Sequence, residues 1–191
     1  MAKPGPRAMA KLKRWMRYLK GTAAMGITYS EHAEDGDKLT AYVDSDFAGD
    51  LDDRRSTTGA VLLLAGGVVD STAVKQTVTA LSSAEAEYTA MSKACTMILY
   101  WRHLLKTINR EQQEATVLFK DSTCAIATST TNKMTQSTKH IDVKYHHVRS
   151  LISDKIVEVK KIGTDFQKAD MLTKSLGAVK FLRNRLSLLG E

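Results

Sequence analysis

The spacing of hydrophobic residues changes along the chain and divides it into helical and extended segments. Between residues 7 and 20, hydrophobic side chains recur at three- and four-residue steps, which predicts an amphipathic helix ended by Gly21. These side chains are Met9, Leu12, Trp15, Met16 and Leu19. Residues 24–29 predict a short strand, and the acidic, turn-rich stretch 31–37 predicts the boundary of the main domain.

A run of extended segments follows this boundary. Three strands with turn residues between them are predicted over 39–47, 59–65 and 68–80. Ser82 and Glu85 then have the spacing of a capping box, which predicts the start of a long helix. Its predicted buried face consists of Ala84, Tyr88, Met91, Cys95, Ile98, Trp101 and Leu105.

The rest of the chain alternates between strands and helices. Strands are predicted over 116–120 and 155–162. Helices are predicted over 122–129, 140–153, 166–174 and 178–189, with a serine- and threonine-rich loop at 128–138. On the last helix, Lys180, Arg183 and Arg185 are predicted to point outward.

This order of elements predicts an α/β fold, a five-stranded mixed sheet with helices on both faces. Hairpins make the first three strands antiparallel, and helical crossovers make the later strands parallel. The length of 191 residues fits one main domain with a small appendage. We therefore expect residues 1–37 to form a basic N-terminal helix and connector, and residues 38–191 to form the domain.

The positive charge of the chain is concentrated at its N-terminal end. Residues 1–20 hold seven basic residues and no acidic residue, which accounts for the whole net charge of +7. Such a segment suits binding to a phosphate backbone, and a solvated helix face is an equal alternative. No run of residues is long and apolar enough for a spanning helix, and no signal-peptide pattern opens the chain. The isolated Cys95 and Cys124 favour buried thiols in a reducing compartment.

Four carboxylates stand at the ends of predicted strands or near the starts of predicted helices: Asp44, Glu87, Asp121 and Asp170. In open α/β sheets, sites gather at such positions. Acidic side chains that meet at one point repel each other and raise each other's pKa unless a cation neutralises them. Hard oxygen ligands favour Mg²⁺ or Mn²⁺ over zinc, and two such ions can drive in-line displacement at phosphorus.

Long sequence motifs around these acids resemble a known family. The stretches YVDSDFAGDLDDRRSTTG, KQTVTALSSAEAEYTA, DSTCAIA, STKHIDVKYHHVR and ADMLTKSL are similar to the ribonuclease H domain of copia-type retrotransposon Pol polyproteins. RYLKGT, at 17–22, is similar to the segment that joins reverse transcriptase to this domain. The resemblance spans about residues 8–188 and implies a ribonuclease-H-like fold. It also implies hydrolysis of the RNA strand of RNA–DNA hybrids during reverse transcription.

The resemblance implies a role for each of the four carboxylates in binding two Mg²⁺ ions, with Mn²⁺ as a substitute. Asp44 would bridge both ions. Glu87 and Asp121 would hold the ion that positions the leaving oxygen, while Asp170 would hold the ion that activates water.

Neighbouring acids compete for two of these roles. Glu85 and Glu87 lie on different faces of the predicted helix, and Glu85 is occupied as the partner in the capping box, which favours Glu87. Asp46 shares a strand face with Asp44 and remains an alternative outer ligand, although a solvated acid at the strand end is favoured. For His146 and His147, on the helix before the last strand, a structural role is favoured over a catalytic one.

A hybrid-specific nuclease must detect 2′-hydroxyl groups on one strand. Ser82, Ser83 and Ser122 stand beside the proposed ligands and are the candidate substrate contacts, with helix capping an equal alternative for the first two. Candidate phosphate contacts are Lys75, Lys139, Lys144 and Lys174.

Two functions from different classes remain open at this point. The first is a ribonuclease H that works with the reverse transcriptase domain of the same polyprotein, in the cytoplasm or a virus-like particle, or in the nucleus. The second is a non-catalytic RNA- or hybrid-binding module, since fold alone does not fix function. The complete set of four acids favours the nuclease, because a binding module has little use for clustered acids facing a polyanion.

Overall fold

The structure is a computed structural model that describes residues 5–30, 32–33, 36–50, 52–122 and 142–190. Its centre is a five-stranded sheet in the order β3-β2-β1-β4-β5, which confirms the predicted mixed α/β fold. The strands are β1 (Thr40–Asp46), β2 (Thr57–Leu64), β3 (Gly67–Lys75), β4 (Thr116–Lys120) and β5 (Val157–Lys161). β1, β2 and β3 pair antiparallel, while β4 lies parallel to β1 and to β5.

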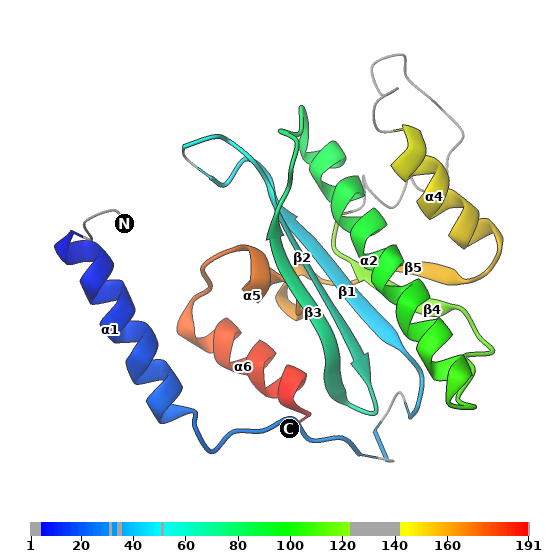
Figure 1. The fold of residues 1–191 in the computed structure, drawn as a ribbon, viewed down its shortest axis with the longest axis horizontal. Helices are drawn as coiled ribbons and strands as arrows, with labels where there is room; N and C mark the ends of the chain where they lie inside the picture. Colours follow the sequence, from blue (N-terminus) through cyan, green and yellow to red (C-terminus); the bar gives the residue numbers. More distant parts are fainter. Residues whose placement is uncertain (1–4, 31, 34–35, 51, 123–141, 191) are drawn as a thin grey trace.

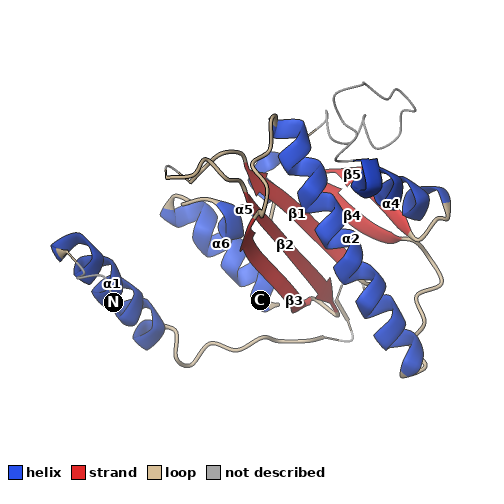
Figure 2. Cartoon of the chain, turned by 45° about the horizontal axis from the view of Figure 1, so that its top comes forward, coloured by secondary structure: helices blue, strands red, loops and turns tan. Residues whose placement is uncertain are grey.

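Helices cover both faces of this sheet (Figure 1, Figure 2). On one face α2 (Ser83–Thr107) lies against β1 and β2, and α4 (Asp142–Ser153) lies against α2 and β5. On the other face the short α5 (Asp170–Thr173) contacts the first three strands, and α6 (Ala178–Leu189) contacts β3. A single 3-10 turn, η2 (Thr164–Phe166), precedes α5.

The alternation of side chains along β1 explains why both faces are covered. Ala41 and Val43 point into the core beneath α2, while Tyr42 points to the opposite face and stacks on Phe119 with ring centroids 4.9 Å apart. Every residue from Thr40 to Ser45 is buried. β1 is therefore a central strand without a solvent face, and a carboxylate at its end is held rigidly.

The N-terminal helix α1 (Pro6–Gly21) forms as predicted but has no buried residue. It lies beside α6 and away from the sheet (Figure 1). Its Tyr18 ring meets Phe181 edge-on at 5.9 Å, and the Arg185 guanidinium lies over the same Tyr18 ring. These are contacts of a surface appendage, not of a core helix.

Three local expectations are wrong. Residues 24–29 form no strand, although the Thr28 amide donates a hydrogen bond to the Leu189 carbonyl at 2.7 Å. β3 ends at Lys75 because the next side chain, Gln76, is buried and donates hydrogen bonds to the Thr58 hydroxyl and the Ala86 carbonyl. The helix expected over 166–174 is divided between η2 and α5.

Several predictions from the sequence lie outside the described residues. These concern the loop at 128–138, Cys124, Lys139 and all but the first residue of the helix at 122–129.

Candidate functional site

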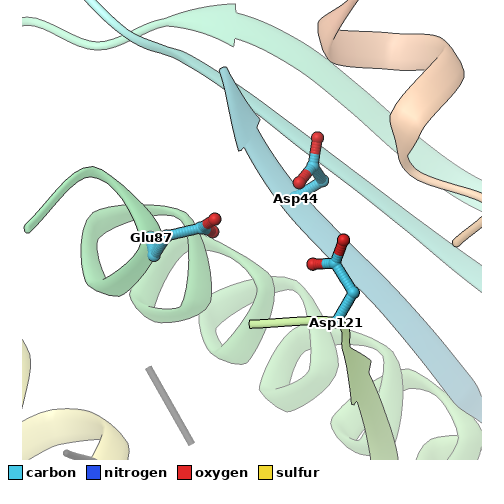
Figure 3. Close-up of side chains that lie close together, drawn as sticks. All are labelled: Asp44, Glu87 and Asp121. Carbon is cyan, nitrogen blue, oxygen red and sulfur yellow. The ribbon is translucent and has the colours of Figure 1, made fainter. Parts of the chain in front are cut away.

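Three of the four predicted carboxylates meet at one edge of the sheet. Asp44 is near the end of β1, Asp121 directly follows β4, and Glu87 lies on the first turns of α2. One oxygen from each of the three carboxylates lies within 4.8 Å of the others. Figure 3 shows the three groups pointing toward one another. They converge because parallel β1 and β4 end at the same edge, where α2 begins.

The fourth carboxylate, Asp170, lies next to Asp44 but outside this group of three. Asp170 is the first residue of α5, and its side chain is fully buried. The Lys174 ammonium joins the two acids, at 2.9 Å from Asp170 Oδ1 and 3.4 Å from Asp44 Oδ2. Asp44 Oδ2 also accepts a hydrogen bond of 2.5 Å from the Thr173 hydroxyl.

Lys120 lies inside the group of three carboxylates, and the sequence analysis did not identify it. Its side chain is fully buried, with Nζ 2.5 Å from Glu87 Oε2, 3.3 Å from Asp121 Oδ1 and 3.6 Å from Asp44 Oδ1. The alternation along β4, in which Thr116, Leu118 and Lys120 are buried, was the available signal. A lysine at the third buried position of a strand requires acidic partners nearby.

Lys180 corrects the predicted orientation of α6. Instead of pointing outward, its ammonium lies 2.5 Å from Asp170 Oδ2 and also donates to the Thr164 carbonyl at 2.7 Å. Arg183 is exposed as predicted, whereas Arg185 is half-buried over Tyr18. The first turn of α6 leans over α5, which places Lys180 against the site.

Burial and neighbouring charges shift two pKa values in the site. Burial raises the pKa of Glu87, and the Lys120 ammonium only partly opposes this effect. Burial alone would lower the pKa of Lys174, but its hydrogen bond to Asp170 and the charges of Asp44 and Asp170 outweigh burial and raise it. Lys174 therefore stays charged at neutral pH, while Glu87 takes up a proton more readily than an exposed glutamate.

Glu85 and Asp46, the acids that compete with the proposed ligands Glu87 and Asp44, have the settings that the sequence favours. Glu85 Oε2 accepts the Leu81 amide at 2.7 Å, and the Ser82 hydroxyl accepts the Glu85 amide at 3.2 Å. The capping box therefore holds Glu85 away from Glu87. Among the residues that the structure describes, Asp46 is not part of the group of three.

The predicted substrate contacts are close in the chain to the clustered acids. Ser82 and Ser83 are exposed at the start of α2, and Ser122 directly follows Asp121. The predicted phosphate contacts differ in setting, because Lys75 is paired with Asp50 and Asp53, whereas Lys174 is paired with Asp44 and Asp170 in the site. The remaining two are Lys144, whose Nζ lies 3.3 Å from the Thr89 hydroxyl, and Lys139, outside the described residues.

The two histidines on α4 do not belong to the group of carboxylates. His147 Nδ1 lies 3.3 Å from the Ser92 hydroxyl on α2, which is a contact between helices, and His146 is exposed.

A buried glutamine fixes the position of Asp170 and was not identified from the sequence. Gln167 is fully buried between η2 and α5, and its amide nitrogen donates to the Val43 carbonyl at 3.1 Å. Its side-chain oxygen accepts the Ala169 amide, and its backbone carbonyl accepts Asn184 of α6. β1, α5 and α6 are therefore joined directly behind Asp170.

The donor set suits a hard divalent cation. Carboxylate oxygens are the preferred ligands of Mg²⁺ and Mn²⁺. Glu87 Oε2 is buried and accepts no hydrogen bond of normal geometry from the described residues, and the Lys120 ammonium lies 2.5 Å from it. The residues fit a divalent ion, and Asp44, Glu87 and Asp121 are the residues that would hold it.

Sequence comparison finds that this chain is similar to a segment of retrotransposon Pol polyproteins. It is 35% identical over 178 residues to the retrovirus-related Pol polyprotein from transposon TNT 1-94 of Nicotiana tabacum, which covers 93% of the chain. It is 32% identical over 172 residues, or 89% of the chain, to the corresponding polyprotein from transposon RE2 of Arabidopsis thaliana. The chain spans only 13% and 12% of the lengths of these relatives. No protein-family model matches it.

Solved structures identify the fold. The ribonuclease H1 of Halobacterium salinarum aligns with a TM-score of 0.53 at 18% identity, covering 71% of this chain and 94% of that one. LC11-RNase H1 from a compost metagenome aligns with a TM-score of 0.55 at 15% identity, covering 72% and 93%. A structure of LC11-RNase H1 in complex with an RNA/DNA hybrid aligns with a TM-score of 0.50 at 14% identity, covering 71% and 94%.

Within the described residues, no helix combines the length and apolar character needed to cross a membrane.

Proposed function

Because the chain is a homologue of the retrovirus-related Pol polyproteins of copia-type transposons, along a segment with the ribonuclease H fold, we propose that it is a metal-dependent ribonuclease H. It would hydrolyse the RNA strand of RNA–DNA hybrids during reverse transcription of a retrotransposon. The observation that carries this proposal is the convergence of Asp44, Glu87 and Asp121 at the edge of the sheet. A partly buried cluster of acids is unfavourable in a fold unless cations neutralise it.

The four carboxylates would hold two divalent ions, Mg²⁺ or Mn²⁺ as a substitute. Asp44 is suited to serve both positions, because its Oδ1 faces the Glu87 and Asp121 side while its Oδ2 faces Asp170 through Lys174. When bound, such ions supply Lewis acidity at the phosphate and lower the pKa of the attacking water. The protein would need no strong base of its own, which agrees with the absence of a histidine from Gly163–Lys168.

The residues around the carboxylates would bind and orient the substrate. The Ser82 hydroxyl accepts the Glu85 amide, and its own proton remains available to donate to a sugar or phosphate oxygen. Ser83 and Ser122 flank the same edge. Lys174, with 39% of its side chain exposed, would contact the phosphate from the Asp170 side. The hybrid bound by LC11-RNase H1 supports this substrate class for the same fold.

A non-catalytic RNA- or hybrid-binding module is the second candidate. The observation that favours it is the set of three lysines, Lys120, Lys174 and Lys180, which already neutralise most of the acidic charge. A site neutralised by its own side chains can face a polyanion without metal. The two candidates differ in one measurable property, because only the nuclease would cleave the RNA strand of the hybrid.

The experiment is cleavage of a labelled RNA–DNA hybrid with and without Mg²⁺, run beside duplex RNA and duplex DNA of the same sequence. The nuclease proposal requires Mg²⁺-dependent cuts in the RNA strand of the hybrid alone. Binding of the hybrid without any cleavage in Mg²⁺ or Mn²⁺ would support the binding module instead.

The partner and the location follow from the same proposal. The reverse transcriptase domain of the same polyprotein would produce the hybrid, so both would work on one nucleic acid. This places the activity in the cytoplasm or a virus-like particle, or in the nucleus.

A further inference from the structure

Among the lysines that the structure describes, Lys120 is the one completely withdrawn from solvent. Lysine is almost never fully buried unless it is paired, because its charge loses the solvation of water. Here the ammonium has three partners, one oxygen each of Glu87, Asp121 and Asp44, at 2.5, 3.3 and 3.6 Å. The three carboxylates thus already surround a cation, and the chain itself supplies it.

An ammonium ion and a divalent ion compete for these same oxygens. Mg²⁺ binds oxygen at about 2.0–2.1 Å, which is closer than any of the Lys120 contacts. A divalent ion bound among the three oxygens would lie within a few ångströms of Nζ, and two cations at such a separation repel strongly in a buried site. Each therefore excludes the other from the space between the carboxylates.

We propose that Lys120 is the resident cation of the Asp44–Glu87–Asp121 group and that a divalent ion binds there only by displacing its ammonium. Lys120 thereby raises the metal concentration at which the group becomes occupied. Its role in turnover rests on the proposed function, whereas the competition itself concerns binding alone. A metal-free protein is held in a neutralised state until metal is abundant.

The charge balance of the whole site points the same way. Four carboxylates face three ammonium groups, those of Lys120, Lys174 and Lys180, which leaves one net negative charge when all are ionised. Two divalent ions would add four positive charges to this site, and a substrate phosphate would remove only one. Keeping all three lysines beside these ions would leave excess positive charge in the site, which favours the departure of an ammonium, and Lys120 is the one that contacts all three clustered acids.

The test is metal binding to the Lys120→Met variant, in which a side chain of similar length lacks the charge. We expect Mn²⁺ and Mg²⁺, titrated alone by calorimetry, to bind this variant roughly tenfold more tightly or better than the wild type. Lys168→Met is the matched control, because it removes a half-buried lysine whose ammonium lies over the Tyr42 ring instead. The control should bind metal as the wild type does. Equal affinity of the wild type and Lys120→Met would overturn the proposal.

A second measurement keeps the test decisive if the variant is unstable. Without Lys120 the three carboxylates repel each other, so Lys120→Met should melt at a lower temperature than the wild type in a chelator. Added Mn²⁺ should raise its melting temperature by more than it raises that of the wild type. A smaller or equal rise for the variant would contradict displacement.

The two proposals fail in different ways. Tighter metal binding by Lys120→Met, without hybrid cleavage by either protein, would support the competition and contradict the nuclease. Cleavage by the wild type with equal metal affinity in both proteins would support the nuclease and contradict the competition.

Discussion

At the scale of single residues, the site depends on carboxylates whose neighbours are cations of the same chain. Asp44 occupies the central place, since its two oxygens face Lys120 and Lys174 on opposite sides. This alternation of acid and ammonium explains how four neighbouring acids, two of them buried and two half-buried, can coexist without metal. Neutralising Asp44, Glu87 or Asp121 leaves Lys120 with two other acidic partners, whereas neutralising Asp170 removes an acidic partner of Lys180.

Asp44→Asn and Asp121→Asn should each abolish hybrid cleavage while leaving the fold intact. Loss of an outer partner of a metal ligand costs up to about 100-fold, and loss of a ligand should cost more. The measurement is the single-turnover rate in Mg²⁺, with circular dichroism to check folding. Asp154→Asn, at an exposed aspartate that accepts the Ser150 hydroxyl, is the control. Near-wild-type rates for either site variant would contradict the assignment.

The two glutamates of α2 should respond differently to the same change. Glu87→Gln should lose hybrid cleavage, because it removes a charged oxygen from the group of three. Glu85→Gln should keep most of it, since glutamine can still accept the Leu81 amide that Glu85 holds. Steady-state cleavage rates for the pair provide the comparison, and the opposite ranking would show that the ligand was chosen wrongly.

As the pH is lowered, the affinity for metal should begin to fall at a higher pH than it would if Glu87 had the pKa of an ordinary glutamate. Burial raises the pKa of Glu87 above its usual 4.5, and the protonated form carries no charge and cannot bind a cation. As pH falls through this raised pKa, the proton replaces the metal, so the dissociation constant for Mn²⁺ should increase. Titrations at a series of pH values test this expectation. An affinity that stays constant down to pH 4.5 would contradict it.

The positions of the four acids at strand ends and helix starts were predictable from the sequence, whereas the contact of Lys180 with Asp170 was not. Each acid stands where a strand ends or a helix starts, and such positions converge in an α/β sheet. Lys180 lies on a different helix from its partner Asp170, so their contact depends on the tertiary placement of α6. Lys120 could have been identified from the alternation along β4, because Leu118 and Lys120 share a buried face.

At the scale of elements, the short pieces around α5 decide where Asp170 lies. The sequence predicted one helix over 166–174, but Gln167 interrupts it and turns its amide into the sheet. Hydrophobic spacing does not reveal this break, since a buried glutamine leaves no periodic signal. The long helix α2 and strands β1 and β4 were predicted to within a few residues, because their buried faces have clear periods.

Gln167→Ala should weaken both stability and catalysis. The change leaves the buried Val43 carbonyl without its donor, which typically costs about 1–3 kcal/mol of unfolding free energy. Asp170 would then lose its fixed distance from Asp44, so the rate of hybrid cleavage should fall as well. Urea unfolding and single-turnover cleavage are the measurements. The exposed Gln113→Ala is the control and should change neither. A stable, fully active Gln167 variant would show that α5 needs no such anchor.

At the scale of the whole molecule, the excess positive charge and the folded sheet lie in different parts of the chain. The sheet and its helices belong to the residues after 20, where basic and acidic residues balance at 21 each. All the excess positive charge lies in residues 1–20, most of which form the exposed helix α1. The sequence left open whether this helix is part of the core. Its apolar side chains are in fact largely exposed, with Trp15 at 61%.

Deleting residues 1–20 should therefore weaken hybrid binding without unfolding the protein. No residue of α1 is buried, and its described ring contacts are limited to Tyr18 with Phe181 and Arg185. Seven basic residues are lost, so the slope of log affinity against log salt should become shallower by about 0.9 for each phosphate contact removed, on the duplex-DNA scale. Turnover at saturating hybrid should change little, since the four carboxylates are retained. Binding titrations over a range of salt and thermal melts of both proteins separate the two roles of α1. An unchanged salt slope together with a collapsed melting temperature would show that the helix stabilises the fold and that its charges only face solvent.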